Sequence, residues 1–125
     1  MAKPVFINTL VFVSDMKRSL AFYCDLLGQT VAQAHGDFVQ LENGLALHSG
    51  PALEATMFGA PSGDRSRYGR GNLVLYFETD EPEAMFARMR PETELIHPIE
   101  TQAWGQKVFR CYDPDGHIVE VGEPI

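Results

Sequence analysis

Alternating apolar and polar residues, each time followed by a helical pattern, occur twice along the chain. The segment 8–15 (NTLVFVSD) is typical of a strand that ends at a helix N-cap, and 72–80 (NLVLYFETD) repeats this design. After each strand, apolar residues recur at helical spacing, over 16–27 in the first copy and 82–90 in the second. The pattern predicts two copies of a strand followed by a helix.

Three short β-rich segments follow each predicted helix, at 30–34, 38–41 and 45–49 in the first half and at 94–97, 106–112 and 117–121 in the second. The chain therefore predicts an α+β fold of two βαβββ modules. The segment 50–71, rich in Gly, Pro, Ser and Arg, predicts a long loop between them. We expect one domain over 1–125, with module 1 at about 4–50, a linker at 51–71 and module 2 at about 72–123.

Two hairpin turns predict which side chains share a face. A two-residue turn at Asn43-Gly44 would mix apolar and polar residues on both faces, whereas a three-residue loop at 42–44 separates them. A loop of the same length suits 114–116. These loops pair Phe38 with His48 and Arg110 with Glu120.

This register divides the strand residues into two faces. The apolar face, which the helices would cover, is the predicted core and holds Val39, Leu41, Leu45, Leu47, Leu73, Leu75, Phe77, Phe109, Cys111, Val119 and Val121. The other face mixes aromatic and polar groups, as a small-molecule site does. It holds Asn8, Leu10, Phe12, Phe38, Gln40, His48, Asn72, Val74, Tyr76, Val108, Arg110, Tyr112, Ile118 and Glu120.

Composition narrows the function classes. The chain is 45% hydrophobic and 22% charged, which is typical of a globular protein, and its net charge of −7 disfavours binding to nucleic acid or to an anionic membrane surface. We find no signal-peptide pattern and no apolar stretch long enough to span a membrane, so a cytoplasmic location is expected. Cys24 and Cys111 show no CxxC spacing and are interpreted as reduced thiols.

Several spaced motifs resemble those of the vicinal oxygen chelate superfamily, which includes glyoxalase I, extradiol dioxygenases and bleomycin-resistance proteins. They are VSD at 13–15, RSLAFY at 18–23, LLG at 26–28, WG at 104–105 and DPDGHIVE at 113–120. The resemblance implies paired βαβββ modules that form a curved mixed sheet around a cavity. It also implies a homodimer, with sites near or across the interface.

The resemblance implies four metal-ligand positions, in the first and fourth strands of each module: Asn8, His48, Asn72 and Glu120. Asparagine is a weaker ligand than the histidine that the family most often places in the first strands. Arg110, expected opposite Glu120, would also compete with a cation. We therefore expect no resident metal, and one divalent ion (Ni, Mn, Zn or Fe) is the alternative.

These residues are compatible with two functions. The first is metal-free sequestration of a cationic or neutral organic molecule, bound by Asn8, Phe38, Gln40, Asn72, Tyr76, Arg110 and Tyr112. The alternative is a divalent-metal-dependent lyase, isomerase or dioxygenase-like enzyme that acts through an enediolate-like intermediate. His48 and Glu120 are the candidate acid/base pair of an enzyme. Whether one chain or two complete the site is also open.

Overall fold

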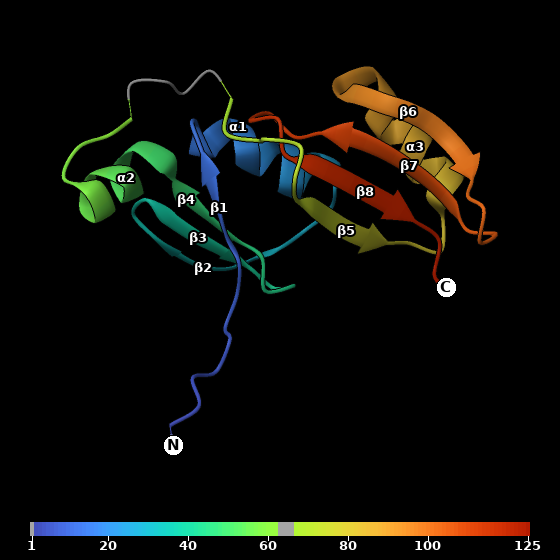
Figure 1. The fold of residues 1–125 in the computed structure, drawn as a ribbon. Helices are drawn as coiled ribbons and strands as arrows, with labels where there is room; N and C mark the ends of the chain where they lie inside the picture. The colour runs from blue at the N-terminus through green and yellow to red at the C-terminus, as the bar shows by residue number, and fades with distance from the viewer. Residues whose placement is uncertain (1, 63–66) are drawn as a thin grey trace.

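The computed structural model describes residues 2–62 and 67–125, which form two four-stranded sheets lying side by side (Figure 1). The first sheet has the order β1-β4-β3-β2 and the second β5-β8-β7-β6. The first consists of β1 (Leu10–Val13), β2 (Val31–His35), β3 (Phe38–Leu41) and β4 (Ala46–Ser49). The second consists of β5 (Val74–Glu78), β6 (Glu94–Thr101), β7 (Lys107–Tyr112) and β8 (Ile118–Gly122).

The helical elements are α1 (Met16–Leu20), the π-helix η1 (Ala21–Leu26), α2 (Gly50–Phe58), α3 (Pro82–Met89) and the 3-10 helix η2 (Arg90–Glu92). In each sheet the outer pair β1–β4 or β5–β8 is parallel and the remaining pairs are antiparallel. The predicted α+β fold with two βαβββ modules is therefore confirmed. No helix within the described residues is long and apolar enough to span a membrane.

The predicted hairpin register is confirmed in both sheets. Phe38 pairs with His48, and Arg110 pairs with Glu120. Gly44 has φ 95° and Gly116 has φ 83°, a left-handed conformation that glycine adopts without the steric cost of a Cβ atom. The two loops therefore close with the same offset and place equivalent residues of both hairpins on the same face.

The prediction of a long loop over 50–71 is wrong in its first part, because residues 50–58 form helix α2. The Ser49 side chain accepts a hydrogen bond from the Ala52 N–H at 3.3 Å, Pro51 lies in the first turn, and Gly59 ends the helix with φ 87°. These capping signals outweigh the loop-like composition. Residues 63–66 of the predicted linker lie outside the described residues.

The first strand of each module is shorter than predicted, so Asn8 and Asn72 precede β1 and β5. Leu73, predicted in the core, also precedes β5 and is 53% exposed. Val108, predicted on the polar face, is fully buried; it pairs with Gly122, which has no side chain to hold the strands apart at this point.

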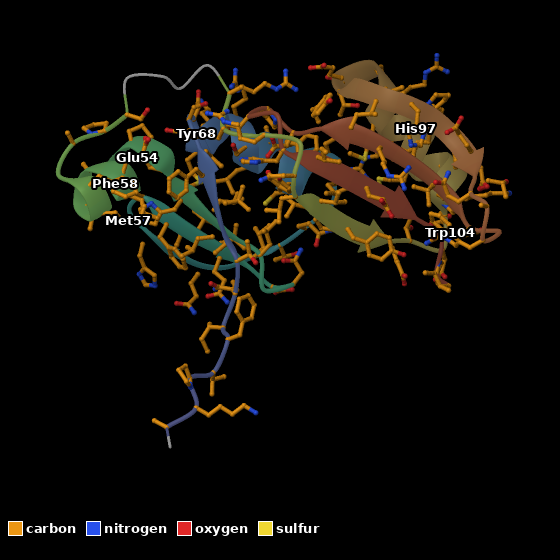
Figure 2. The ribbon with its side chains drawn as sticks, viewed as in Figure 1. Glu54, Met57, Phe58, Tyr68, His97 and Trp104 are labelled. Carbon is orange, nitrogen blue, oxygen red and sulfur yellow. The ribbon has the colours of Figure 1, made fainter. Side chains whose placement is uncertain are left out.

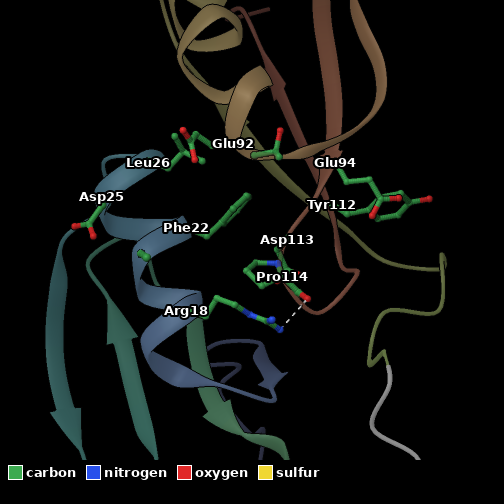
Figure 3. Close-up of a pocket in the computed structure, with 11 residues that line it drawn as sticks. Arg18, Phe22, Asp25, Leu26, Glu92, Glu94, Tyr112, Asp113 and Pro114 are labelled. Carbon is green, nitrogen blue, oxygen red and sulfur yellow. Dashed lines mark hydrogen bonds between the residues drawn. The ribbon is translucent and has the colours of Figure 1, made fainter.

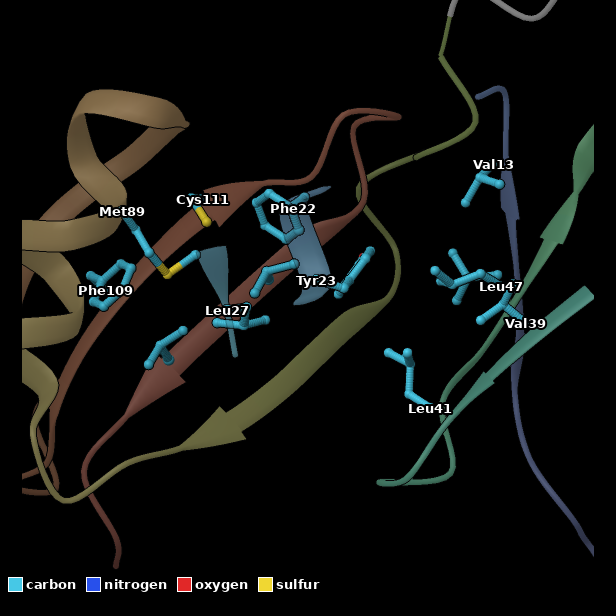
Figure 4. Close-up of a cluster of buried hydrophobic side chains, with 13 residues drawn as sticks. Val13, Phe22, Tyr23, Leu27, Val39, Leu41, Leu47, Met89, Phe109 and Cys111 are labelled. Carbon is cyan, nitrogen blue, oxygen red and sulfur yellow. The ribbon is translucent and has the colours of Figure 1, made fainter. Parts of the chain in front are cut away.

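Among the described residues, one hydrophobic cluster joins the two modules (Figure 4). Figure 4 shows Phe22, Tyr23 and Leu27 between the side chains of the two sheets, among them Leu47 of the first and Phe109 of the second. Burial of these apolar side chains is the main stabilising contribution expected for such a core. The two sheets therefore belong to one packed unit.

The Asp113–Gly116 turn also connects the modules. Tyr23 donates a hydrogen bond from its hydroxyl to Asp113 Oδ2 at 2.7 Å, and Asp113 Oδ1 accepts from the backbone N–H groups of Asp115 and His117. Asp115 in turn accepts from the Ser14 N–H. Burial and the neighbouring carboxylate of Asp113 raise the pKa of Tyr23 well above its ordinary value. This turn motif therefore has a structural role in the fold.

Candidate functional site

Four polar side chains lie in one row across the second sheet. Tyr76 of β5 pairs with Glu120 of β8, Glu120 with Arg110 of β7, and Arg110 with His97 of β6. Residues that pair in register point to the same side of a sheet. Their strand neighbours, such as Val119 and Cys111, are fully buried against the core. The ionic row, Tyr76–Glu120–Arg110–His97, therefore lies on the face opposite the core.

Arg110 is held in place from both sides of this row. Its Nε donates to Glu120 Oε1 at 2.8 Å, and its Nη1 lies 2.8 Å from His97 Nε2 and 3.3 Å from Gln102 Oε1. The side chains of Arg110 and Glu120 are only 25% and 15% exposed. A guanidinium can only donate, so His97 Nε2 must accept, and the ring proton belongs on Nδ1. His97 Nδ1 faces the Pro98 carbonyl oxygen at 2.7 Å.

A hydrogen-bonded chain borders the row at the β6–β7 loop. The Tyr76 hydroxyl donates to Glu78 Oε2 at 2.6 Å and accepts from Gln106 Nε2 at 2.7 Å, while Gln106 Oε1 accepts from Trp104 Nε1 at 2.7 Å. The hydrogen bond to Glu78 raises the pKa of Tyr76. Trp104 is 60% exposed and lies in the β6–β7 loop, at the outer side of the second sheet (Figure 2). The indole is thus available to a ligand beside the ionic row.

The equivalent row of the first sheet is aromatic. Phe12 of β1 pairs with His48, His48 with Phe38, and Phe38 with His35. The ring centroid of Phe38 lies 6.3 Å from that of His48 and 6.4 Å from that of His35. The aromatic row, Phe12–His48–Phe38–His35, offers ring surface rather than paired charges.

Tyr68 and helix α2 border the aromatic row at β1 (Figure 2). The Tyr68 ring meets Phe12 edge-on, with centroids 5.6 Å apart. The Tyr68 hydroxyl donates to Glu54 Oε1 at 2.9 Å, and the Glu54 side chain is buried in α2. The predicted linker therefore supplies part of the wall next to this row.

The remaining predicted ligand-binding residues lie at different distances from the rows. Gln40 is two residues beyond Phe38 on the same face and accepts from Gln33 Nε2 at 3.4 Å. Asn8 and Asn72 lie four positions before Phe12 and Tyr76, outside the strands. No hydrogen bond or ring contact joins the two rows within residues 2–62 and 67–125.

Tyr112 lies at the end of β7, where the Arg67 guanidinium covers its ring at 4.4 Å. It lines a separate groove of about 570 Å³ between η1 and the start of β6 (Figure 3). Phe22 and Leu26 supply apolar surface there, and the charged groups are mixed: Arg18, Asp25, Glu92 and Glu94. The groove lies apart from both rows.

The four predicted ligand positions do not fit a resident divalent ion. Glu120 already accepts from Arg110, so a guanidinium stands beside the carboxylate that a metal would need. His48 is on the other sheet, with its Nδ1 3.0 Å from the Ser49 carbonyl oxygen, and the two asparagines are weak ligands. Among the described residues, no group of three or more His, Cys, Asp or Glu could hold a metal ion.

Sequence reasoning missed His97, Gln102 and Gln106 as members of the site. For His97 a signal existed, because both modules carry a histidine in the second strand, His35 in one and His97 in the other, and each pairs with the equivalent hairpin position. For Gln102 and Gln106 the sequence held no such signal, because their contacts depend on how the β6–β7 loop folds over the sheet.

Comparison with known proteins places this geometry in a family. The family model of the glyoxalase-like domain matches residues 6–125. Bleomycin resistance proteins from Geobacillus stearothermophilus and Staphylococcus aureus are 25% identical to this chain, over 90% of it and 92% of their own length.

Solved structures share the fold over nearly the full chain. A protein of unknown function from Agrobacterium tumefaciens strain C58 is 47% identical, with a TM-score of 0.92 over 100% of this chain and 98% of that one. A glyoxalase-related enzyme from Fulvimarina pelagi is 20% identical, with a TM-score of 0.79 over 96% of this chain and 88% of that one. Together with the domain match, the paired βαβββ modules show that this chain belongs to the glyoxalase-like family of the vicinal oxygen chelate superfamily.

Proposed function

We propose that this chain binds and sequesters a small organic molecule, cationic or neutral, without a resident metal. The observation that carries the proposal is the ion pair of Arg110 and Glu120, because it commits the one carboxylate of the predicted ligand set to a guanidinium. A metal-assisted enediolate mechanism requires that carboxylate to be free. Binding requires only the polar and aromatic side chains that are already in place.

The aromatic row and the net charge of −7 support the class of ligand. Ring faces such as that of Phe38 attract flat ring systems and cations. The negative charge of the protein raises the local concentration of cations and disfavours anions. Resistance to a drug can be obtained by holding it unchanged, and the name of the bleomycin resistance proteins is consistent with this kind of function.

A second copy of the chain is the proposed partner that closes the site. Val5, Phe6 and Ile7 are 78%, 81% and 75% exposed, in an N-terminal arm that runs away from the body of the molecule (Figure 1). Leu10, Val74 and Tyr76 on the sheet faces are also more than 40% exposed. Apolar surface of this kind is typical of an interface.

We also propose that the protein works in the cytoplasm. Cys24 and Cys111 are both free thiols, as is usual in a reducing compartment. Burial raises the pKa of Cys111 to about 11, so this thiol is unreactive at neutral pH.

Titration of chelator-treated protein with a planar aromatic cation, 9-aminoacridine, tests ligand binding. The fluorescence of the acridine itself reports binding at either row, and Trp104, the only tryptophan, reports binding beside the ionic row. We expect saturable binding without metal, weakened about tenfold by Phe38→Ala through loss of ring contact. Phe58→Ala, which removes a 75% exposed ring at the end of α2, is the matched control and should have no effect.

The same preparation is titrated calorimetrically with nickel, manganese, zinc and iron(II). We expect no stoichiometric binding. About one equivalent of metal per chain that is lost in Glu120→Gln would overturn the proposal in favour of the metal-dependent enzyme.

Sedimentation velocity tests whether two copies of the chain associate. We expect a dimer for the wild type, dissociation for Phe6→Asp and an unchanged dimer for Phe58→Asp. The control introduces the same charge at a residue that is 75% exposed, against 81% for Phe6. A wild-type monomer at high concentration would refute self-association.

A further inference from the structure

Arg110 has more donors than its protein contacts use. Its Nε–H is taken by Glu120, and the two N–H groups of Nη1 are taken by His97 and Gln102. Nη2 has no hydrogen-bond partner among residues 2–62 and 67–125, although the side chain is only 25% exposed. A guanidinium held at three of its five donors is rigid, so binding an acceptor at Nη2 costs little conformational entropy.

We infer that Arg110 Nη2 binds a neutral oxygen acceptor of the ligand, such as the carbonyl oxygen of a ketone or amide attached to a flat ring system. The inference rests on the proposed function and names the class of ligand that this site takes.

The charges around Arg110 favour a neutral acceptor over a carboxylate. Glu120 lies 2.8 Å from Arg110 Nε and balances its charge. Glu100 Oε1 lies 3.2 Å from Nδ1 of His97, whose Nε2 is bonded to Arg110. An anionic group at Nη2 would therefore approach two carboxylates with only one guanidinium to offset them. A carbonyl oxygen gains the charge-assisted hydrogen bond without that repulsion.

His97 is the positioning residue for this donor. Its Nε2 must be unprotonated to accept from Arg110 Nη1 at 2.8 Å. The charged groups that face the imidazole are Glu100 on β6, 3.2 Å from Nδ1, and Arg110 on β7, with Glu120 on β8 behind it. A side chain without an acceptor at this position leaves that Nη1 N–H unpaired. Arg110 then loses one of its three anchors.

The inference is tested with two probes of the same shape, 9-fluorenone and fluorene, which differ by a carbonyl group in place of a CH₂. Trp104 fluorescence gives the dissociation constants. We expect fluorenone to bind about tenfold more tightly than fluorene, as a single hydrogen bond from a charged donor allows. Fluorene-9-carboxylate should bind more weakly than fluorenone.

Removal of the donor should abolish the preference for the carbonyl probe. The double variant Arg110→Met/Glu120→Met removes both charges, so neither is left unpaired and the sheet stays folded. It should bind fluorenone and fluorene with equal affinity. Equal binding of the two probes to the wild type overturns the inference alone. Absence of binding by fluorene, fluorenone and 9-aminoacridine overturns the proposed function as well.

The role of His97 is tested by two substitutions that differ in whether they keep an acceptor for Arg110 Nη1. His97→Gln keeps an acceptor, so it should retain the preference for fluorenone over fluorene, whereas His97→Leu should lose it. His35→Gln in the aromatic row is the matched control and should leave the preference unchanged. A full preference for fluorenone in His97→Leu would show that His97 does not position Arg110.

Discussion

The hairpins β3–β4 and β7–β8 have the same register, yet their open faces carry different chemistry. At equivalent positions, the first hairpin pairs Phe38 with His48, and the second pairs Arg110 with Glu120. Their turns differ as well: Asn43 bonds to Gln29 and Leu45 of its own module, whereas Asp113 accepts from Tyr23, a residue 90 positions away. The two hairpins thus share their backbone geometry, while the open face of one supplies rings and that of the other supplies charge. The turn of the second hairpin also connects the modules.

The largest expected effect is a difference in stability loss between substitutions in the two hairpin turns. Asp113→Ala leaves the Tyr23 hydroxyl and two backbone N–H groups without a buried acceptor, so we expect it to lower the free energy of unfolding by about 3 kcal/mol. Asn43→Ala, in the exposed turn of the first hairpin, should cost about 1 kcal/mol or less. Urea unfolding of the two variants measures this difference. Equal losses would mean that the Asp113 turn does not connect the modules.

A smaller difference is expected between the coupling energies of the two cross-strand pairs, Arg110–Glu120 and Phe38–His48. A double-mutant cycle of Arg110→Met and Glu120→Met should give a favourable coupling of about 1–2 kcal/mol, because both side chains are mostly buried and bonded. The matched cycle of Phe38→Leu and His48→Leu should give about 0.5 kcal/mol, since the rings are 6.3 Å apart. The coupling energies are obtained from chemical unfolding at neutral pH. A larger coupling in the aromatic pair would reverse the comparison.

The smallest effect is confined to alkaline pH and again concerns the second turn. Because the pKa of Tyr23 is raised in the folded protein, its contribution to stability is complete below the unfolded-state value of about 10 and is lost as pH rises through the folded-state value. The difference in free energy of unfolding between the wild type and Tyr23→Phe should therefore become smaller as pH rises. The decrease should be less than about 1 kcal/mol at pH 10.5. Thermal unfolding of both proteins between pH 8 and 10.5 measures the difference. A flat difference would mean that Tyr23 titrates alike in both states.

Much of the fold and part of the site could be predicted from local signals. Loop length and a left-handed glycine are enough to pair Phe38 with His48 and Arg110 with Glu120, because a hairpin turn sets its own register over a few residues. The caps of helix α2 were also present in the sequence at Ser49 and Gly59, although the composition of the segment concealed them.

The rest depended on contacts between residues far apart in the chain. Strand β6 has register shifts on both sides of His97, so alternation along the strand could not predict that His97 would meet Arg110. The anchoring of Asp113 by Tyr23 required the two modules to pack first. Local sequence was sufficient where the interaction closes within one hairpin or one helical turn. Packing of the modules decided which polar groups bond across them, because bulges and relative placement of the sheets do not follow from residue spacing.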